Sequence, residues 1–463
     1  MGGPQSGLGS SAADPSAAPT RRKLFGTDGV RGVAGEKLTG ELALALGRAA
    51  AAAARDAGVQ HPRVLLIRDT RESGEMLEAA LAAGVAAEGG EVLLGGVLPT
   101  PAAPLLVDRH GLDLAAVLSA SHNPYRDNGI KFFGADGHKL SDAAELDIER
   151  RIEGPDAPAP AAIGRIRDLH GTQEDYLRAL QERFGDLDLS GLDVLLDCAH
   201  GATHRVGPEI FRRLGADVTV IGDAPDGRNI NAGCGSTHVD GLAKAVVAGG
   251  HDIGFAFDGD GDRVLAVDRD GVVVDGDELV ALVALHLRRG GRLAGNGVAV
   301  TVMTNYGFHA AMAEAGIAVA TTKVGDRYVL EELRERGWVL GGEQSGHIIE
   351  LGFAPSGDGI ASALLTLEAL GGADLARRGG MRKLPQRLVN VPVADRDAAI
   401  ADPALSAATA HEAEGLAGRG RVLVRPSGTE QLVRVMVEAP TEDEAEAVCA
   451  RLVAIVAGGE TAP

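Results

Sequence analysis

The sequence contains few of the residues on which several classes of protein depend. Its 463 residues include only three cysteines, which lie far apart and form no Cys-x-x-Cys pair: Cys198, Cys234 and Cys449. Isolated thiols of this kind predict neither a disulfide framework nor a cysteine zinc site. They fit the reducing environment of the cytoplasm, which is where we expect the protein to be located.

Positive charge and long apolar runs are also scarce. The chain has 45 Lys and Arg against 65 Asp and Glu, a formal net charge of −20. An acidic chain without a long basic run is a poor candidate for binding nucleic acid or an anionic membrane. No uninterrupted apolar stretch is long enough to span a membrane. Residues 1–23 are mostly small and polar and lack the apolar region of a signal peptide, so we predict a disordered N-terminal tail.

What the chain does contain is a repeated order of apolar segments. A buried strand, an amphipathic helix and a second strand are predicted three times, in the ranges 63–97, 193–222 and 297–342. This alternation predicts βαβ units and mixed or parallel sheets covered on both faces. A single large doubly wound sheet would fit the same pattern, but the chain length and the Pro- and Ala-rich spacer 154–164 favour separate domains.

The last part of the chain has a different pattern. RVLVRPS and LVRVMVEA are predicted to be neighbouring strands, and a helix follows with Thr441 as its N-cap. This predicts a smaller α+β domain that could close over a cleft. We therefore divide the chain into a tail and four domains: 1–23, 24–170, 171–275, 276–388 and 389–463.

The strongest local motif is DGDGDR, which follows the apolar run DIGFAF. Asp258, Asp260 and Asp262 alternate with glycines that allow the loop to curl and the carboxylates to converge. Oxygen ligands of this kind suit a hard cation, and Mg²⁺ beside a phosphate is the best fit. An EF-hand would need Gly at the sixth position and Glu at the twelfth, where this chain has Arg263 and Arg269. The alternative is a solvated Asp-Gly turn.

The motif SASHNP places Ser121 at the end of the predicted strand DLAAVLSA. It is not a GxSxG motif, so an α/β-hydrolase nucleophile is not supported. A serine opposite a metal loop with an adjacent arginine suits phosphate chemistry. His122 and Lys131 could then supply charge or proton transfer. Taken alone, the motif could also be a turn capped by Asn123.

Three further loops combine glycine with polar side chains. GGEQSGH (341–347) offers a carboxylate, a hydroxyl and an imidazole, which suit the hydroxyls and amine of a sugar. RPSGTE (425–430) offers an arginine, two hydroxyls and unobstructed backbone N–H groups, which suit a phosphate. FGTDGVRG (25–32) contributes Arg31 on a Gly-rich loop. For each of the first two loops, an ordinary turn is the alternative.

Together these stretches resemble the α-D-phosphohexomutase superfamily over essentially the whole chain after residue 23. The motifs that carry the resemblance are, in order, LFGTDGVRG, RDTRESG, SASHNP, NGIKFF, DCAHGA, NINAGCGSTH, DGDGDR, KVGDRY, GGEQSGHI and RPSGTE. Within the superfamily, the chain is most similar to bacterial phosphoglucosamine mutases. It departs from the usual motifs at Ile67, His200 and Gln431, none of which replaces a proposed catalytic group.

The resemblance implies three similar α/β domains with mixed sheets and a smaller C-terminal α+β domain, arranged around a central cleft. It implies that Ser121 carries a phosphoryl group and, with Asp258, Asp260 and Asp262, binds Mg²⁺. The residues around the transferring phosphate would be Arg31, His122, Lys131 and Arg263. The sugar and the distal phosphate would be bound by Lys323, Glu343, Ser345, His347, Arg425, Ser427, Gly428 and Thr429.

The implied activity converts glucosamine 6-phosphate to glucosamine 1-phosphate, on the route to UDP-N-acetylglucosamine and cell-wall precursors. Glucosamine 1,6-bisphosphate or glucose 1,6-bisphosphate would serve as intermediate or activator. The expected partner is a small sugar phosphate, and the chain could form a homodimer. Alternatives are a phosphomannomutase or phosphoglucomutase of the same superfamily, or a sugar-phosphate-binding protein without catalysis.

Overall fold

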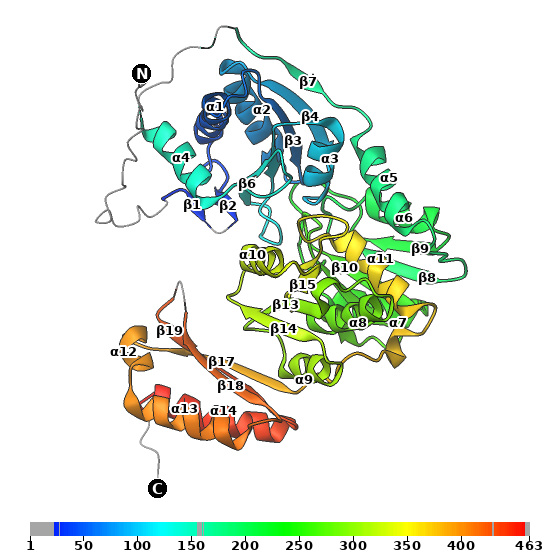
Figure 1. Ribbon diagram of the computed structural model, residues 1–463, viewed down its shortest axis with the longest axis vertical. Coiled ribbons are helices and arrows are strands. Elements are labelled where there is room, and N and C mark those ends of the chain that lie inside the picture. The colour runs from blue at the N-terminus through cyan, green and yellow to red at the C-terminus, as the bar shows by residue number, and fades with distance from the viewer. Residues whose placement is uncertain (1–22, 27, 155–159, 161, 428–429, 459–463) are drawn as a thin grey trace, which may run out of the picture.

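The computed structural model describes residues 23–26, 28–154, 160, 162–427 and 430–458. Apart from Lys23, the predicted N-terminal tail lies outside these residues, as do Gly428, Thr429 and part of the spacer 154–164. The described residues form four sheets that follow one another along the chain (Figure 1). Among these residues, no helix combines the length and the apolar character that crossing a membrane requires.

Domain 1 is built on a seven-stranded mixed sheet with the order β1-β2-β6-β5-β3-β4-β7. Strands β5, β3, β4 and β7 are parallel, whereas β1, β2 and β6 pair antiparallel at the other edge. The strands are β1 (Phe25–Gly26), β2 (Gly29–Val33), β3 (Arg63–Arg68), β4 (Glu91–Val97), β5 (Leu114–Leu118), β6 (Asp127–Gly134) and β7 (Ile166–Asp168). The helices are α1 (Gly40–Asp56), α2 (Ser73–Ala87), α3 (Ala102–His110) and α4 (Asp142–Glu153).

Domains 2 and 3 repeat the mixed arrangement in smaller sheets, with the orders β12-β11-β10-β8-β9 and β14-β13-β15-β16. The domain 2 elements are α5 (Thr172–Phe184), β8 (Asp193–Asp197), α6 (Val206–Arg213), β9 (Asp217–Ile221), α7 (Asp240–Gly249), β10 (Ile253–Phe257), β11 (Val264–Asp268) and β12 (Val273–Val274). The domain 3 elements are α8 (Gly276–Arg289), β13 (Gly297–Thr301), α9 (Tyr306–Glu314), β14 (Ala318–Thr322), α10 (Asp326–Arg336), β15 (Leu340–Gly342), β16 (Ile348–Glu350) and α11 (Gly359–Leu370). The short 3₁₀ helices Ala294–Asn296 and Leu375–Arg377 complete domain 3.

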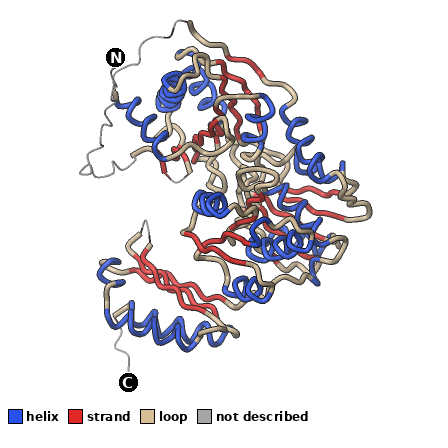
Figure 2. The backbone as a smooth tube through the Cα atoms, viewed as in Figure 1, coloured by secondary structure: helices blue, strands red, loops and turns tan. Residues whose placement is uncertain are grey.

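Domain 4 has a three-stranded antiparallel sheet, in the order β17-β19-β18, with helices on one face (Figure 2). Its elements are β17 (Gln386–Pro392), α12 (Arg396–Ile400), α13 (Pro403–Gly415), β18 (Arg421–Pro426), β19 (Leu432–Glu438) and α14 (Glu442–Val456). The Thr441 side chain accepts a hydrogen bond from Glu444 N, so it caps α14 as predicted. Strand β17 begins three residues before the boundary that we predicted at residue 389.

The strands that lead into the predicted site are buried along their whole length. Every residue of β5 and of β10 is buried, because helices cover both faces of these sheets. Both strands end in the polar loops singled out in the sequence. Loops at the carboxyl ends of strands are where α/β sheets usually bind ligands.

Domains 1, 2 and 3 share a hydrophobic core, whereas domain 4 has a separate one. One continuous core runs from Leu65 to Leu375 and joins residues of domains 1, 2 and 3. Domain 4 has its own core, formed between Val391 and Leu452. Polar contacts join it to domain 3: the Glu438 carboxylate accepts a hydrogen bond from the backbone N–H of Tyr306 at 2.7 Å, and Arg421 Nη1 donates to Val302 O at 3.0 Å. Within domain 4, Arg421 and Glu438 pair with each other at 2.8 Å.

Candidate active site

Ser121 occupies a strained turn directly after β5. Its φ of 51° is in the left-handed region, which is uncommon for a residue with a side chain. Ser121 N donates to Ser119 Oγ at 2.9 Å, and Ser121 O accepts from Arg71 Nη2 at 2.8 Å and from Asn231 Nδ2 at 2.9 Å. These three bonds hold the serine in a conformation that costs about 1–3 kcal/mol.

The hydroxyl of Ser121 points at the acidic loop of domain 2. Ser121 Oγ donates to Asp258 Oδ2 at 2.6 Å and lies 3.2 Å from His122 Nδ1. The two loops approach so closely that a Cβ on Gly259 would lie 2.6 Å from Ser121 O. Only glycine fits at this position. Because Gly259 has no side chain, the loop that carries Asp258 and Asp260 can approach the Ser121 turn closely.

Asp258, Asp260 and Asp262 converge as their spacing predicted. Their ligand atoms lie within 4.8 Å of one another, and all three residues are buried. Among the described atoms, Asp260 Oδ1 and Asp262 Oδ1 are buried without a hydrogen-bond partner. Burial and the neighbouring carboxylates of Asp262 and Asp260 raise the pKa of Asp258 well above its ordinary value. A buried set of converging carboxylate oxygens, two of them without a hydrogen-bond partner, fits a hard divalent cation.

Cationic side chains surround the same point. Lys131 Nζ lies 2.9 Å from Asp260 Oδ2, and Arg263 Nε lies 3.7 Å from Asp262 Oδ1. Burial, followed by the charges of Arg263 and Arg31, lowers the pKa of His122, so its imidazole is neutral near pH 7. The structure thus brings together all the residues that we predicted around the transferring phosphate.

The predicted sugar-binding loop joins two antiparallel strands, β15 and β16, in domain 3. Glu343 Oε1 accepts a hydrogen bond from Gly325 N at 2.9 Å. His347 Nδ1 lies 3.5 Å from Asp262 Oδ2, so this loop contacts the acidic loop directly. Ser345 and Lys323 are exposed, and the Lys323 ammonium lies 5.9 Å from the centre of the Tyr328 ring.

The predicted phosphate loop lies in domain 4, at the end of β18. Ser427 is buried, and its Oγ accepts a hydrogen bond from Glu430 N at 3.3 Å. Arg425 Nη2 lies 3.2 Å from Met303 Sδ of domain 3. Arg434 stands directly opposite Arg425 in the antiparallel register of β18 and β19. Like charges at opposed positions are destabilising, which suits a site that binds an anion.

Several charged residues that hold these groups in place had no role assigned from the sequence, although most of them lie in the motifs that carry the resemblance. Arg71, in the RDTRESG motif, is completely buried behind the serine loop. Asp28 contacts both Arg31 and Lys131, and Lys139 links Asp28 to Asp326 of domain 3. Arg434 could have been found from the predicted pairing of the last two strands, but the other contacts join distant parts of the chain.

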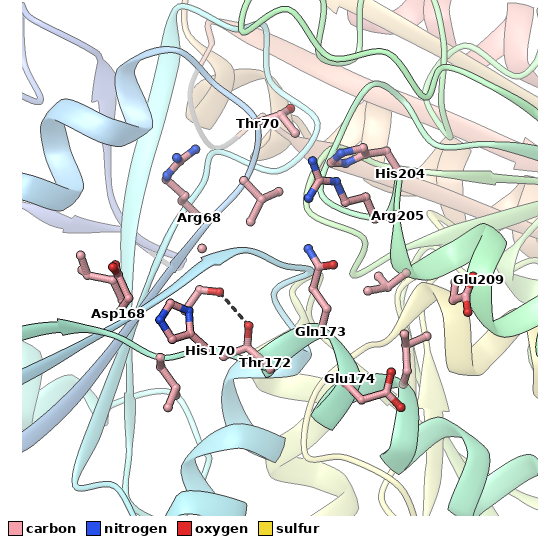
Figure 3. A pocket seen from close by; sticks show the side chains of 18 of the residues that line it. Arg68, Thr70, Asp168, His170, Thr172, Gln173, Glu174, His204, Arg205 and Glu209 are labelled. Atoms are coloured by element: carbon pink, nitrogen blue, oxygen red, sulfur yellow. Dashed lines mark hydrogen bonds between the residues drawn. The ribbon is translucent and has the colours of Figure 1, made fainter.

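A separate groove of about 1020 Å³ lies between domains 1 and 2, and Arg68 and Arg205 approach it from the two sides (Figure 3). No residue that we predicted for the site is among its described lining residues. Arg68 is already paired with Glu75 at 3.0 Å and with Glu78 at 3.3 Å. One lining atom, Glu78 Oε1, is buried without a hydrogen-bond partner, but the described lining residues form no converging carboxylate set like that of Asp258, Asp260 and Asp262.

Comparison with known proteins agrees with this geometry. Family models of phosphoglucomutase/phosphomannomutase domains match four consecutive stretches that cover most of the chain: alpha/beta/alpha domain I at residues 22–158, domain II at 174–271, domain III at 275–386 and the C-terminal domain at 388–455. A phosphoglucosamine mutase of Moorella thermoacetica is 52% identical over 94% of this chain and 99% of its own length. One of Nocardioides sp. is 51% identical over 94% of this chain and 98% of its own length.

Solved structures show the same fold. A phosphoglucomutase/phosphomannomutase family protein from Burkholderia thailandensis superposes with a TM-score of 0.80 at 25% identity, over 95% of this chain and 98% of its own. Aspergillus fumigatus N-acetylphosphoglucosamine mutase, solved in complex with GlcNAc-6P and magnesium, gives a TM-score of 0.63 at 19% identity, over 96% and 97% of the two chains. The match of four consecutive domain models and the identity over nearly the full length lead to one conclusion: the chain belongs to the phosphoglucomutase/phosphomannomutase family.

Proposed function

We propose that this protein is a phosphoglucosamine mutase, an isomerase that interconverts glucosamine 6-phosphate and glucosamine 1-phosphate. The contact between Ser121 Oγ and Asp258 Oδ2, at 2.6 Å, is the observation that carries the proposal. It places a buried hydroxyl against an acidic set that fits a cation, with Lys131 and Arg263 beside it. Relatives that are 52% identical over 94% of the chain and carry this name support the choice of sugar.

In the proposed reaction, phosphorylated Ser121 is the phosphoryl donor. The bond between Ser121 Oγ and phosphorus breaks as a bond from the sugar 1-hydroxyl oxygen to phosphorus forms, which yields glucosamine 1,6-bisphosphate. The bisphosphate turns within the site, and Ser121 Oγ then takes the 6-phosphoryl group, which leaves glucosamine 1-phosphate. One phosphoryl group leaves the serine and one returns, so the enzyme is regenerated.

Proton balance in this scheme assigns a role to His122. A sugar hydroxyl loses a proton in the first transfer while the serine oxygen gains one, and the second transfer reverses this exchange. The neutral imidazole of His122 lies 3.2 Å from Ser121 Oγ and can accept and return that proton. The positive charges of Arg31, Lys131 and Arg263 would stabilise the equatorial oxygens of the transferring group.

The cation that we propose is Mg²⁺, held by Asp258, Asp260 and Asp262 together with the Ser121 phosphate. It would withdraw charge from the phosphoryl group as a Lewis acid. Without it, three buried carboxylates face one another with two of their oxygens unsatisfied. The Aspergillus fumigatus enzyme was solved with magnesium, and a variant of it was solved with glucose 1,6-bisphosphate. Either glucosamine 1,6-bisphosphate or glucose 1,6-bisphosphate could supply the first phosphoryl group to Ser121 here.

Substrate recognition would involve two loops. Glu343, Ser345, His347 and Lys323 would contact the sugar, and the non-reacting phosphate would bind Arg425, Ser427, Gly428 and Thr429. Arg434, opposite Arg425, would add a second guanidinium to that phosphate site. The net charge of −20 argues against a nucleic-acid or membrane partner, and we propose a cytoplasmic location and a homodimer as the form to test.

The proposal is tested by comparing glucosamine 6-phosphate, glucose 6-phosphate and mannose 6-phosphate as substrates of the wild type and of Ser121→Ala. We expect the wild type to prefer glucosamine 6-phosphate, and peptide mapping to locate its phosphate on Ser121. Ser121→Ala should fold but lose nearly all activity, because no second group can hold the phosphoryl intermediate. Ser190→Ala, an exposed serine of domain 2, is the matched control.

Other outcomes would replace the proposal. A preference for glucose or mannose phosphate would make the protein a phosphoglucomutase or a phosphomannomutase. Binding of sugar phosphate without turnover, and without phosphate on Ser121, would make it a binding protein.

A further inference from the structure

An ion pair that touches neither the acidic loop nor the serine joins domain 1 to domain 3 behind the site. Lys139 Nζ lies 2.6 Å from Asp28 Oδ1 and 2.5 Å from Asp326 Oδ2. Lys139 follows β6 in domain 1, whereas Asp326 is the first residue of α10 in domain 3, which lies at the end of that domain facing domain 1 (Figure 1). One ammonium group therefore bridges carboxylates from two domains.

Each end of this bridge contacts groups that we assign to the substrate. Asp28 also lies 3.1 Å from Lys131 Nζ and accepts a hydrogen bond from Arg31, two of the cations around Ser121. Asp326 Oδ2 lies 3.8 Å from Nε2 of His347, in the loop assigned to the sugar. A line of alternating charges thus runs from the phosphate-binding cations, through Asp28, Lys139 and Asp326, to the sugar-binding histidine.

We propose that Lys139 is a positioning residue for phosphoryl transfer. It would keep Asp28 and Asp326 at a set distance, and so align the cations of domain 1 with the sugar loop of domain 3. The inference rests on the proposed function. In this proposal Lys139 does not contact the substrate. It positions Arg31 and Lys131 through the Asp28 carboxylate, and His347 through the Asp326 carboxylate.

The charge states of the three groups fit this role. Burial lowers the pKa of Lys139, but Asp326 and Asp28 outweigh that effect and raise it above its ordinary value. Burial raises the pKa of Asp326, but Lys139 and His347 bring it down to about 2. Lys139 therefore stays charged and Asp326 ionised at neutral pH. Burial raises the pKa of Asp28, but Lys131, Lys139 and Arg31 bring it well below its ordinary value, so Asp28 is ionised as well. Without Lys139, the carboxylates of Asp28 and Asp326 would face each other, and Asp28 would contact only Arg31 and Lys131.

The surroundings allow these groups to move if the bridge is cut. A cavity of about 270 Å³ adjoins the bridge, and Lys139, Asp326 and His347 are among the residues that line it. Space of this size can hold water, so Asp326 could turn away and become solvated. Loss of Lys139 should therefore misalign the site more than it unfolds the protein.

The experiment compares steady-state kinetics with glucosamine 6-phosphate and melting temperatures of the full-length wild type and variants. Lys139→Met should lower kcat by about 10- to 100-fold, as loss of an outer supporting partner typically does, with a smaller change in KM. Lys139→Arg should recover part of the loss because it restores the charge. The double variant Lys139→Met/Asp326→Asn should be no slower than Lys139→Met, because it removes one of the two facing carboxylates.

A second ion pair across the same boundary provides the matched control. Arg327 binds Asp142 and donates to Leu140 O at 2.8 Å, also joining domain 3 to domain 1, but it contacts none of the residues assigned to the substrate. The Arg327 side chain is largely buried and also lies 3.6 Å from the buried Glu145, so Arg327→Gln should lower the melting temperature. It should leave kcat close to that of the wild type, because the guanidinium contacts neither Asp28 nor the carboxylate of Asp326. If Lys139→Met does not fold, Asp326→Asn, which is almost the same size, should still lower kcat.

Two results would overturn the inference while leaving the proposed function intact. One is a folded Lys139→Met variant with the kcat of the wild type. The other is an equal loss of kcat in Arg327→Gln, which would assign the effect to domain docking alone. A wild type that is inactive on all three hexose phosphates would instead refute the proposed function.

Discussion

Arg71 holds the serine loop of domain 1, and replacing it should separate the stability of the protein from its activity. Its side chain is fully buried, with Nε 2.8 Å from Asp69 Oδ2. Its other N–H groups donate to backbone carbonyl oxygens of the serine loop, those of Ser121, Asn123, Pro124 and Asp127. A single guanidinium therefore compensates a buried carboxylate and fixes the turn that presents the nucleophile.

The size of the effect follows from these contacts. Arg71→Met leaves the buried Asp69 without its cation, and removing one partner of a buried pair costs about 3–5 kcal/mol. For a domain of this size, such a loss corresponds to a fall in melting temperature of roughly 6–20 °C. Burial already raises the pKa of Asp69, and loss of the arginine would raise it further. The double variant Arg71→Met/Asp69→Asn should therefore regain much of the lost stability.

Activity should respond differently. Arg71→Lys keeps a positive charge beside Asp69, but one ammonium cannot reach all four carbonyl groups in the planar geometry of arginine. Ser121 would then relax from its left-handed conformation, and a shift of about 1 Å in a reacting group can cost roughly a hundredfold in rate. We expect Arg71→Lys and the double variant to melt near the wild type and yet be at least tenfold slower.

Melting temperature, kcat and the phosphate content of Ser121 are the measurements. A folded Arg71→Lys variant with the wild-type kcat would refute the reasoning. So would a double variant that recovers its activity together with its stability.

Three further predictions follow from the site and its surroundings. Arg425→Ala should raise KM and lower kcat, and Arg425→Lys should restore only part, because it loses the bidentate geometry; unchanged kinetics in both would remove Arg425 from the site. Asp258→Asn should raise the melting temperature of EDTA-treated protein, because two carboxylates about 4 Å apart repel by roughly 4 kcal/mol at an intermediate dielectric. We expect Mg²⁺ to raise the melting temperature of the wild type, and Asp258→Asn should abolish this increase. We choose Asp258 because Asp260 is paired with Lys131; an unchanged Mg²⁺ effect would contradict a metal site. Burial and then Asp275 raise the pKa of Asp277 to about 7, so the folded protein keeps a proton there that the unfolded chain loses near pH 3.9. As the pH rises from about 3.9 to about 7, the free energy of unfolding should therefore fall by up to about 4 kcal/mol. Asp277→Asn should flatten this pH dependence when unfolding is followed in urea; a variant with the pH dependence of the wild type would refute the raised pKa of Asp277.

The sequence predicted the architecture well because that information is local. Strands such as 63–68 and 193–197 are short apolar runs followed by amphipathic helices, and the structure confirms them as β3 and β8. Element boundaries are less certain, because the residues at helix ends are polar. Within the range 297–342, the segment YVLEELRERG (328–337) is the predicted second helix, whereas helix α10 begins two residues earlier, at Asp326.

The acidic loop could also be foreseen from neighbouring residues alone. Three carboxylates separated by glycines must lie close together in any turn, and in the structure they lie within 4.8 Å. That Ser121 would meet this loop was inferred from the kinds of residue involved, since the two are separated by 137 positions. The roles assigned to the individual residues remain predictions until the variants are measured.

Only the tertiary structure could show how these groups are supported. Lys139 and Asp326 are separated by 187 positions. Asp326 lies in the motif KVGDRY, but nothing in that motif or in the residues around Lys139 indicates that the two side chains pair, because their pairing depends on how the sheets of domains 1 and 3 pack against each other. The same is true of Arg71, whose acceptors are backbone carbonyl groups, which every residue has. Short spacings along the chain, which hold in any fold, thus identify the groups that could do the chemistry. Packing between domains decided which charges hold those groups in place, because a buried ion pair forms only where the fold brings its two partners out of water together.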